Sequence, residues 1–577
     1  MHQGRRPRAV VCLLVVLSSV LAACTNAPPP PLVAPPVPTP APGGKQPMPT
    51  EVVVGVDSLE GGFNPHTLAD LSPTSSALSS LMLPSVFRPA ADGTRQLDST
   101  LMESAEPVPG AQRFTVRYRI RKEAAWSDGA PIAAEDFVYL WEQLRSQPGV
   151  ADPAGYQLIH DVVSRDGGKT VEVSFDRPYP GWQSLFTNLL PAHLLRDAPR
   201  GWASALDGGY PASGGPFAIR QVDKQRGEVI LERNDRYWGP PAVSDRIVLR
   251  ASDQAAQVSA LRSGDSHLAV FGADARTVSQ LRELNPAVQV STVPRPATMQ
   301  VLLRPTSPQL ADTRVRNAVV AGLDRQALID VGSGGGPADQ LRAHAQVLAP
   351  SEPGYTPTEP PGQISDRPDP ERLQRLLTEA GYRHEAGAWV KDGRPLNLVI
   401  AAPFEHEQYI KIAEAAAAQL RAQDVQATVV TPTGDQLFGE MLPSNPLAAD
   451  PAAAPVDMAI APRPADGDPA ALLASAYGCP GADADDQPFP FNATGFCDQL
   501  LQPTIDAALS GAIPFPEASA KVESVLWSQA VALPLYQQAQ VLAVGNEVSG
   551  VQRGNGLAGP FSTAAQWRGT PSENDGY

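Results

Sequence analysis

The residues that could carry out catalysis are few and widely spaced in this 577-residue chain. No two of the eight histidines are four residues apart, so the zinc motif His-Glu-x-x-His is absent. Ser333 lies within the glycine run 332–336, but Val331 stands where a nucleophile elbow requires glycine. A dinucleotide-binding glycine pattern also fails, because its third glycine would fall on Pro337. The run predicts a flexible loop, and we expect no enzyme activity, no cofactor and no metal site.

The four cysteines, at positions 12, 24, 479 and 497, offer a different chemistry. Their spacing contains no Cys-x-x-Cys pair and excludes a zinc-finger site. Three arginines, at positions 5, 6 and 8, precede an apolar run over residues 9–23. This run ends in Leu21-Ala22-Ala23, and Cys24 follows directly. This is the pattern of a bacterial lipobox, in which the cysteine is acylated and becomes the mature N-terminus. The alternatives are an ordinary cleaved signal peptide and a membrane-spanning helix, although fifteen apolar residues are too few to cross a ~30 Å hydrocarbon core.

The segment after Cys24 predicts a tether. Residues 25–50 contain eleven prolines, which favour an extended polyproline-like chain over helix or sheet. We therefore expect a signal peptide over residues 1–23, a lipidated tether over 24–50, and a folded body from Glu51. The expected location is the extracytoplasmic face of the cell membrane, held by the lipid alone.

The charge balance argues against a nucleic-acid partner. The chain has 45 Lys+Arg and 61 Asp+Glu, a net charge of −16, whereas sequence-independent nucleic-acid binding needs clustered basic residues.

The body from Glu51 alternates strand and helix patterns, which indicates an α/β fold. The predicted strands are 51–57, 113–120, 169–175, 228–233, 246–250, 396–401, 425–430 and 456–460. The predicted helices are 135–147, 253–262, 312–331, 371–380, 408–421 and 517–530. Residues 332–366 and 461–494 are expected to be irregular, and residues 295–305 and 531–545 to cross between two lobes as a pair.

A run from Ile120 to Phe137 carries the most specific family signal. It reads as a strand, the turn Trp126-Ser127-Asp128-Gly129, and a helix opening with Ala134-Glu135-Asp136. Five further motifs follow in order: Ser213-Gly214-Gly215-Pro216-Phe217, Asn234-Asp235-Arg236-Tyr237-Trp238, Arg314 to Arg325, Leu376 to Tyr382, and Leu533-Pro534-Leu535-Tyr536. Together they resemble the family 5 extracellular solute-binding proteins, the oligopeptide- and dipeptide-binding type.

This resemblance implies a two-lobed periplasmic binding protein-like fold (type II, peptide-binding cluster) with hinge-linked lobes and a monomeric state. We expect lobe I with an inserted subdomain over 51–300, lobe II over 301–530, and a return to lobe I with a C-terminal tail over 531–577. Cys479 and Cys497 predict a disulfide in an oxidising compartment, as in dipeptide-binding members; two buried free thiols are the alternative.

The function that the resemblance implies is the solute-binding component of an ABC transporter, with a permease partner and a small peptide or other solute as ligand. Within the family, the stretches Gly62 to His66, Gln147 to Val150 and Tyr477 to Pro480 resemble those of an actinobacterial lipoprotein group. That group is linked to phosphatidylinositol mannoside and lipoarabinomannan synthesis. That similarity implies the alternative of a non-transport envelope regulator, binding a glycolipid precursor or a membrane protein of envelope biosynthesis. An exported hydrolase, the third possibility, has no catalytic constellation to support it.

Peptide-binding members place a Trp and an Asp in a stretch like Trp-x-x-Asp-x-x-Asp-Pro, where the first Asp binds the peptide's amine. Here these positions fall on Pro462 and Ala465, and Asp466 fits only with a one-residue shift. Without the acid, a buried ammonium group would lack a partner, so we expect binding of unmodified peptides to be weak. The remaining candidate ligand contacts are Asn64, Gly214, Gly215, Gln300, Asp468 and Tyr477.

Overall fold

The computed structural model describes residues 50–90, 93–362, 364–443, 456–480, 492–554 and 556–569. The predicted signal peptide, Cys24 and the tether up to residue 49 lie outside them. Across the described ranges, no helix combines the length and apolar character needed to span a bilayer.

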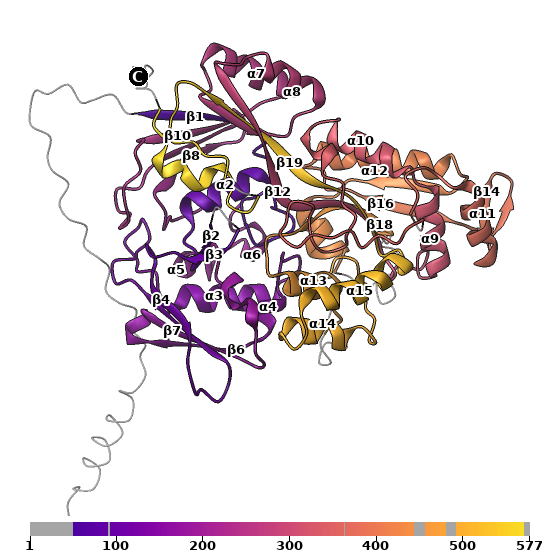
Figure 1. Ribbon diagram of the computed structural model, residues 1–577, viewed down its shortest axis with the longest axis horizontal. Coiled ribbons are helices and arrows are strands. Elements are labelled where there is room, and N and C mark those ends of the chain that lie inside the picture. Colours follow the sequence, from indigo (N-terminus) through magenta and orange to yellow (C-terminus); the bar gives the residue numbers. More distant parts are fainter. Residues whose placement is uncertain are drawn as a thin grey trace, which may run out of the picture.

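A ten-stranded sheet runs through both lobes in the order β17-β16-β18-β12-β19-β11-β1-β10-β9-β8 (Figure 1). Its strands are β1 (Glu51–Val56), β8 (Phe217–Asp223), β9 (Glu228–Arg233), β10 (Arg246–Ala251), β11 (Leu268–Phe271), β12 (Val288–Leu303), β16 (Asn397–Ala401), β17 (Gln426–Val430), β18 (Met458–Pro464) and β19 (Ala532–Gly545). The antiparallel pair β12 and β19 joins the two halves and crosses the middle of the molecule. The predicted pair of crossings is therefore present, and the two-lobed fold is confirmed.

Lobe I adds a four-stranded antiparallel sheet in the order β4-β5-β7-β6. The strands are β4 (Met102–Pro107), β5 (Thr115–Ile120), β6 (Ile159–Arg165) and β7 (Thr170–Phe175), and the short pair β2 (Phe87–Pro89) and β3 (Arg95–Leu97) lies nearby. Its helices are α2 (Pro73–Met82), α3 (Ala134–Ser146), α4 (Ala154–Gln157), α5 (Ala192–Leu195), α6 (Gly201–Ser204), α7 (Gln254–Ser263) and α8 (Ala275–Arg282).

The family motif before α3 has a structural role. The buried carboxylate of Asp136 accepts hydrogen bonds from the Ala133 and Ala192 backbone N–H groups (3.0 and 2.9 Å) and from Trp126 Nε1 (3.2 Å). Burial raises the pKa of Asp136 to about 6. One side chain thus fixes the turn, the start of α3 and the start of α5.

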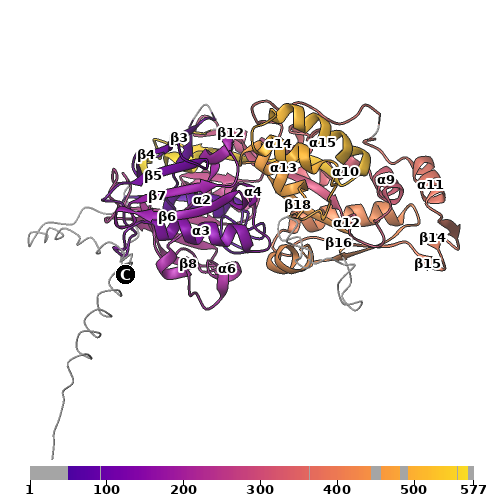
Figure 2. The same ribbon diagram turned by 90° about the horizontal axis from the view of Figure 1, so that it is seen from below.

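In the described residues, lobe II consists of its half of the main sheet, a small hairpin sheet, seven α-helices, a short 3-10 helix (Pro337–Gln340) and a π-helix (Gln436–Met441). The hairpin strands are β13 (Arg383–Glu385), β14 (Ala388–Lys391) and β15 (Arg394–Pro395). The helices are α9 (Thr313–Gly322), α10 (Arg325–Ser333), α11 (Pro370–Glu379), α12 (Glu407–Arg421), α13 (Pro469–Tyr477), α14 (Gln502–Leu509) and α15 (Phe515–Gln529). Helices α13–α15 share a buried apolar cluster with lobe I and lie beside the junction between lobes (Figure 2).

Two expectations about lobe II were wrong. The single helix predicted over 312–331 is two helices, because Leu323 is extended and the Asp324 carboxylate caps α10 by accepting from Ala327 N (2.8 Å). The segment predicted as irregular over 461–494 contains the end of β18 and the whole of α13, which begins after its N-cap Asp468.

The glycine run 332–336 forms a contact between the lobes. Ala275 N of lobe I donates to Gly334 O (3.1 Å). A Cβ on Gly336 would lie 1.9 Å from the Ala273 carbonyl oxygen, so only glycine permits this approach. The predicted loop therefore serves as a close-packed interlobe contact.

Cys479 and Cys497 form the predicted disulfide, 18 residues apart. Closing a loop of this size stabilises the folded state by about 3 kcal/mol in the chain-entropy treatment. We predict that Cys479→Ser with Cys497→Ser lowers the unfolding free energy by about that amount, measured by urea denaturation. Peptide mapping without reductant should recover the linked pair from the native protein, whereas two alkylated thiols would contradict the assignment.

Candidate functional site

A cavity of about 530 Å³ lies in lobe I at the junction with lobe II. Its lobe I walls come from α2, from the β2–β3 region and from the C-terminal segment 556–565. The crossing residues 293–296 and the lobe II residues Asp466 and Gly467 complete it. The volume falls within the range of sites that enclose one small-molecule ligand, about 300–1,000 Å³.

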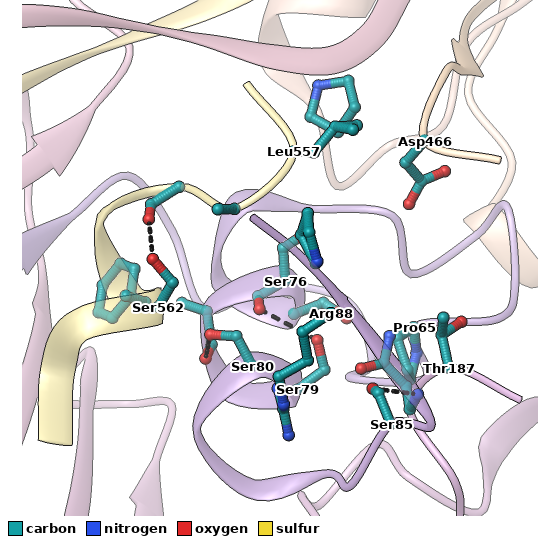
Figure 3. A pocket seen from close by; sticks show the side chains of 18 of the residues that line it. Pro65, Ser76, Ser79, Ser80, Ser85, Arg88, Thr187, Asp466, Leu557 and Ser562 are labelled. Atoms are coloured by element: carbon teal, nitrogen blue, oxygen red, sulfur yellow. Dashed lines mark hydrogen bonds between the residues drawn. The ribbon is translucent and has the colours of Figure 1, made fainter. Parts of the chain in front are cut away.

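Hydroxyl groups from α2 form one wall of the cavity (Figure 3). The helix starts because Ser72 caps it by accepting from Ser75 N (3.0 Å) and Pro73 occupies its first turn. Its apolar face packs into the core and leaves Ser76, Ser79 and Ser80 toward the cavity. The Ser76 hydroxyl donates to Ser72 O (2.9 Å) and accepts from Arg295 Nη2 (3.4 Å), and the Ser80 hydroxyl donates to Ala77 O (2.8 Å). Because a hydroxyl oxygen has two lone pairs, each serine can still accept a hydrogen bond from a ligand.

The charged residues of the cavity compensate one another. Three arginines and three aspartates line it: Arg88, Arg95, Arg295, Asp98, Asp152 and Asp466. Arg88 and Asp98 form an ion pair at 2.6 Å, and Arg95 donates to the backbone carbonyl of Asp466 across the lobe boundary. The cavity therefore presents hydrogen-bonding groups without a strong net charge.

Asp466 supplies the acid that the sequence comparison located at Ala465. Ala465 is buried with 1% exposure, and its N–H donates to Pro296 O (2.8 Å). The Asp466 carboxylate instead faces the cavity (Figure 3). Burial raises its pKa, and the nearby Arg95 guanidinium opposes that rise. A ligand amine would have to compete for this carboxylate with Arg95 and Arg295.

Asp152 connects the two lobes at the same place. Ser475 Oγ of lobe II donates to Asp152 Oδ1 (2.7 Å) and accepts from Ala154 N (3.2 Å). Burial raises the pKa of Asp152 to about 7, and the charges of Asp466 and Asp468 act in the same direction. A protonated Asp152 thus avoids repulsion between carboxylates of the two lobes.

The structure separates the predicted ligand residues into two groups. In lobe I, Asn64 is fully buried; its Oδ1 accepts from His66 N (3.1 Å), which shapes a loop whose Pro65 and His66 line the cavity. Gly214 and Gly215 pack against the end of α2, where a Cβ on Gly215 would lie 2.2 Å from Leu81 O. These three residues position parts of the wall.

The lobe II candidates lie elsewhere. Gln300 and Tyr477 line a second, smaller cavity of about 50 Å³. Asp468 caps α13 by accepting from Ala471 N (3.0 Å). Sequence analysis missed the hydroxyls of α2 and three charged residues, Arg95, Asp152 and Arg463. The Ser72-Pro73 helix-start signal is the one sequence feature that could have indicated the helix carrying those serines.

The described residues contain no group of three or more His, Cys, Asp or Glu side chains arranged to hold a metal ion.

Two lobes linked by a crossing strand pair, with a polar cavity at their junction, define a two-lobed solute-binding protein. The family model for bacterial extracellular solute-binding proteins, family 5, matches residues 101–483, and the chain belongs to this family. The resemblance inferred from sequence motifs is confirmed.

Relatives and solved structures agree with this assignment. The chain is 37% identical, over 98% of both chains, to "Probable monoacyl phosphatidylinositol tetramannoside-binding protein LpqW" of Mycobacterium tuberculosis. It is 26% identical to the oligopeptide-binding protein OppA of Mycobacterium bovis, over 81% of this chain and 76% of that protein. The fold matches Bacillus subtilis AppA in complex with a nonapeptide (TM-score 0.70, 16% identity, 91% and 100% of the two chains). It also matches Haemophilus influenzae OppA in complex with a peptide (TM-score 0.67, 19% identity, 90% and 99%).

The raised pKa of Asp152 predicts a pH-dependent stability. The folded state binds this proton up to pH about 7 and the unfolded state only up to about 3.8, so the unfolding free energy falls as pH rises through that window. We expect Asp152→Asn to remove this loss, so that wild type loses stability relative to the variant between pH 5 and pH 8 in urea denaturation.

The exposed Asp197, changed to Asn, serves as the control and should show no such pH-dependent difference. An equal difference between wild type and Asp152→Asn at both pH values would contradict the assignment.

Proposed function

We propose that this protein is a lipid-anchored, extracytoplasmic binding protein that takes a hydroxyl-rich solute, the glycan part of an envelope glycolipid, into the interlobe cavity. The observation that carries the proposal is the α2 hydroxyl wall beside charged residues of both signs, of which Arg88 and Asp98 form an ion pair. Serine hydroxyls and carboxylates are suitable partners for sugar hydroxyls. The amine of a peptide, in contrast, requires an unpaired anionic partner, and the Asp466 carboxylate already lies near Arg95 and Arg295.

The similarity to the LpqW relative supports this ligand class. That protein is named for binding a monoacyl phosphatidylinositol tetramannoside, and it aligns with nearly the whole of this chain. The cavity has room for part of such a headgroup, with the rest of the lipid outside. The protein then acts in envelope glycolipid synthesis as a non-transport regulator, together with a membrane protein of that machinery.

The second candidate is the solute-binding component of an ABC importer. Its support is the family itself, the OppA relatives and the peptide-bound neighbours in fold. The Asp466 carboxylate in the cavity is the feature that favours this role. Co-purification with a permease, and micromolar peptide binding lost in Asp466→Ala, would establish it in place of the regulator.

We predict that the full-length protein binds mannose-containing envelope oligosaccharides more tightly than a pool of unmodified di- to pentapeptides in calorimetry. Ser76→Ala should weaken glycan binding about 2- to 10-fold, because one hydrogen bond contributes about 0.5–1.5 kcal/mol. Ser279→Ala is the matched control: Ser279 is also exposed on a helix and donates to the carbonyl four residues earlier (3.0 Å). Glycan binding unchanged by Ser76→Ala but lowered by Ser279→Ala, or tighter binding of simple peptides, would refute the proposal.

The lipid anchor has its own test. Cys24→Ala should shift the protein from the membrane to a soluble or unprocessed fraction, because the acylated residue is lost. Fractionation with mass spectrometry of the mature N-terminus measures this. An unchanged membrane fraction without bound acyl chains would show that something other than Cys24 holds the protein.

A further inference from the structure

A second cavity, of about 50 Å³, shares one lining residue with the main cavity. Ala151 of lobe I lines both cavities. The walls of the smaller cavity come mainly from lobe II, including the end of β18, α13 and Gln300 of β12. It therefore lies at the same lobe junction as the main cavity.

Arg463 brings an unpaired guanidinium to this cavity. The residue is 5% exposed, and its Nη1 donates to Pro464 O (2.9 Å). Its Nε and Nη2 atoms have no hydrogen-bond partner in the described part of the chain. These two nitrogens belong to one edge of the planar guanidinium, so their N–H bonds point in parallel as a two-donor fork.

Gln300 adds a second unsatisfied group on the same face of the sheet. Thr298 and Gln300 of β12 lie opposite Arg463 and Ala461 of β18, so the antiparallel register places all four side chains on one face. Gln300 is 4% exposed, and its Oε1, like the Thr298 hydroxyl, has no hydrogen-bond partner among the described residues. An amide can present either its oxygen or its NH₂ group to the cavity.

The other polar groups of the wall already have partners. The Tyr477 hydroxyl lies within hydrogen-bond distance of Gln346 O (3.2 Å), and the Ser475 hydroxyl donates to Asp152. Thr494 Oγ1 donates to Asn492 Oδ1 (2.6 Å). The unused hydrogen-bonding capacity of this wall is therefore concentrated on Arg463 and Gln300.

No carboxylate within the described ranges forms an ion pair with Arg463. Glu352 is close enough for the Arg463 charge to lower its pKa, although burial raises that pKa overall to about 7. The Glu352 carboxylate is held by Ala349 N (2.6 Å). A buried guanidinium without a counter-ion costs several kcal/mol, which an anion in the cavity would offset.

We propose that Arg463 and Gln300 form an oxyanion subsite that receives a carboxylate or phosphate group of the bound solute. The proposal rests on the function proposed above and specifies its ligand further: a hydroxyl-rich body in the main cavity with an acidic group in the smaller, neighbouring cavity. The Nε–Nη2 fork matches two oxygens of one carboxylate or phosphate. One water molecule needs only about 10–15 Å³, so a cavity of this size admits a group of several atoms.

The test uses the full-length protein and simple anions. Melting temperatures are measured in sodium acetate and in sodium phosphate, each against the sodium salt of a bulky sulfonate buffer at equal ionic strength and pH. A specific site gives a melting temperature that rises with the logarithm of the anion concentration above its Kd. The larger rise, with acetate or with phosphate, identifies the acidic group that the subsite prefers.

Arg463→Met is the decisive variant. We expect it to lose the anion-dependent rise and, in the bulky salt, to melt above wild type, because it removes a buried charge without a partner. Arg276→Met, at an exposed arginine of α8, is the control and should keep the full rise. Gln300→Leu retains the fork and should reduce the rise without abolishing it, which gives a second measurement if Arg463→Met folds poorly.

The subsite is overturned if wild type shows no anion-dependent rise, or if Arg463→Met or Gln300→Leu keeps the full rise. The anions carry no glycan, so this result is independent of oligosaccharide binding. Glycan binding without an anion effect would leave the proposed function standing and remove the subsite. An anion effect without glycan binding would leave the subsite standing and remove the proposed function.

Discussion

The antiparallel pairing of β12 with β19 is the constraint on which the rest of the molecule depends. The two strands join both halves of the main sheet, and β12 pairs with β18 of lobe II on its other side. Any relative motion of the lobes has to bend this pair. The register shifts between Pro294 and Thr298, and again after Met299, interrupt its ladder at the junction. Bulges of this kind bend strands, so the two crossing strands are continuous between the lobes but can bend where they pass the cavity.

Closure of the lobes also determines the electrostatics of the cavity. Arg95 of lobe I donates to a lobe II carbonyl, Asp152 binds Ser475, and helices α13–α15 share an apolar cluster with lobe I. Desolvation strengthens each of these polar contacts and makes an unpaired group costly. The main cavity and the smaller cavity that Arg463 lines both lie at this junction.

The sequence predicted the fold much better than the site. Strand-length β-branched runs and helix-cap residues are local signals, and the motif around Asp136 indicates a family because one buried carboxylate organises a local turn. The cavity combines residues that are hundreds of positions apart, such as Arg95 and Asp466. The periodicity of hydrophobic residues in a sequence does not show which side chains meet across a junction between lobes. The β18 pattern indicated a strand, but nothing in it showed that Arg463 is buried without a counter-ion.

Both ends of the described chain lie on lobe I. Thr50 bonds to Asp245 through its N–H and hydroxyl (2.8 and 3.0 Å), and the Ser244 hydroxyl donates to Trp567 O (2.8 Å). Lobe II is joined to lobe I by the crossing strands and by the interlobe contacts of Arg95, Asp152 and the glycine run. If the N-terminus is held at a surface, lobe I is the attached lobe, and any change between the lobes moves lobe II against it. A partner that distinguishes the ligand-bound protein from the ligand-free one therefore has to contact lobe II or the boundary between the lobes.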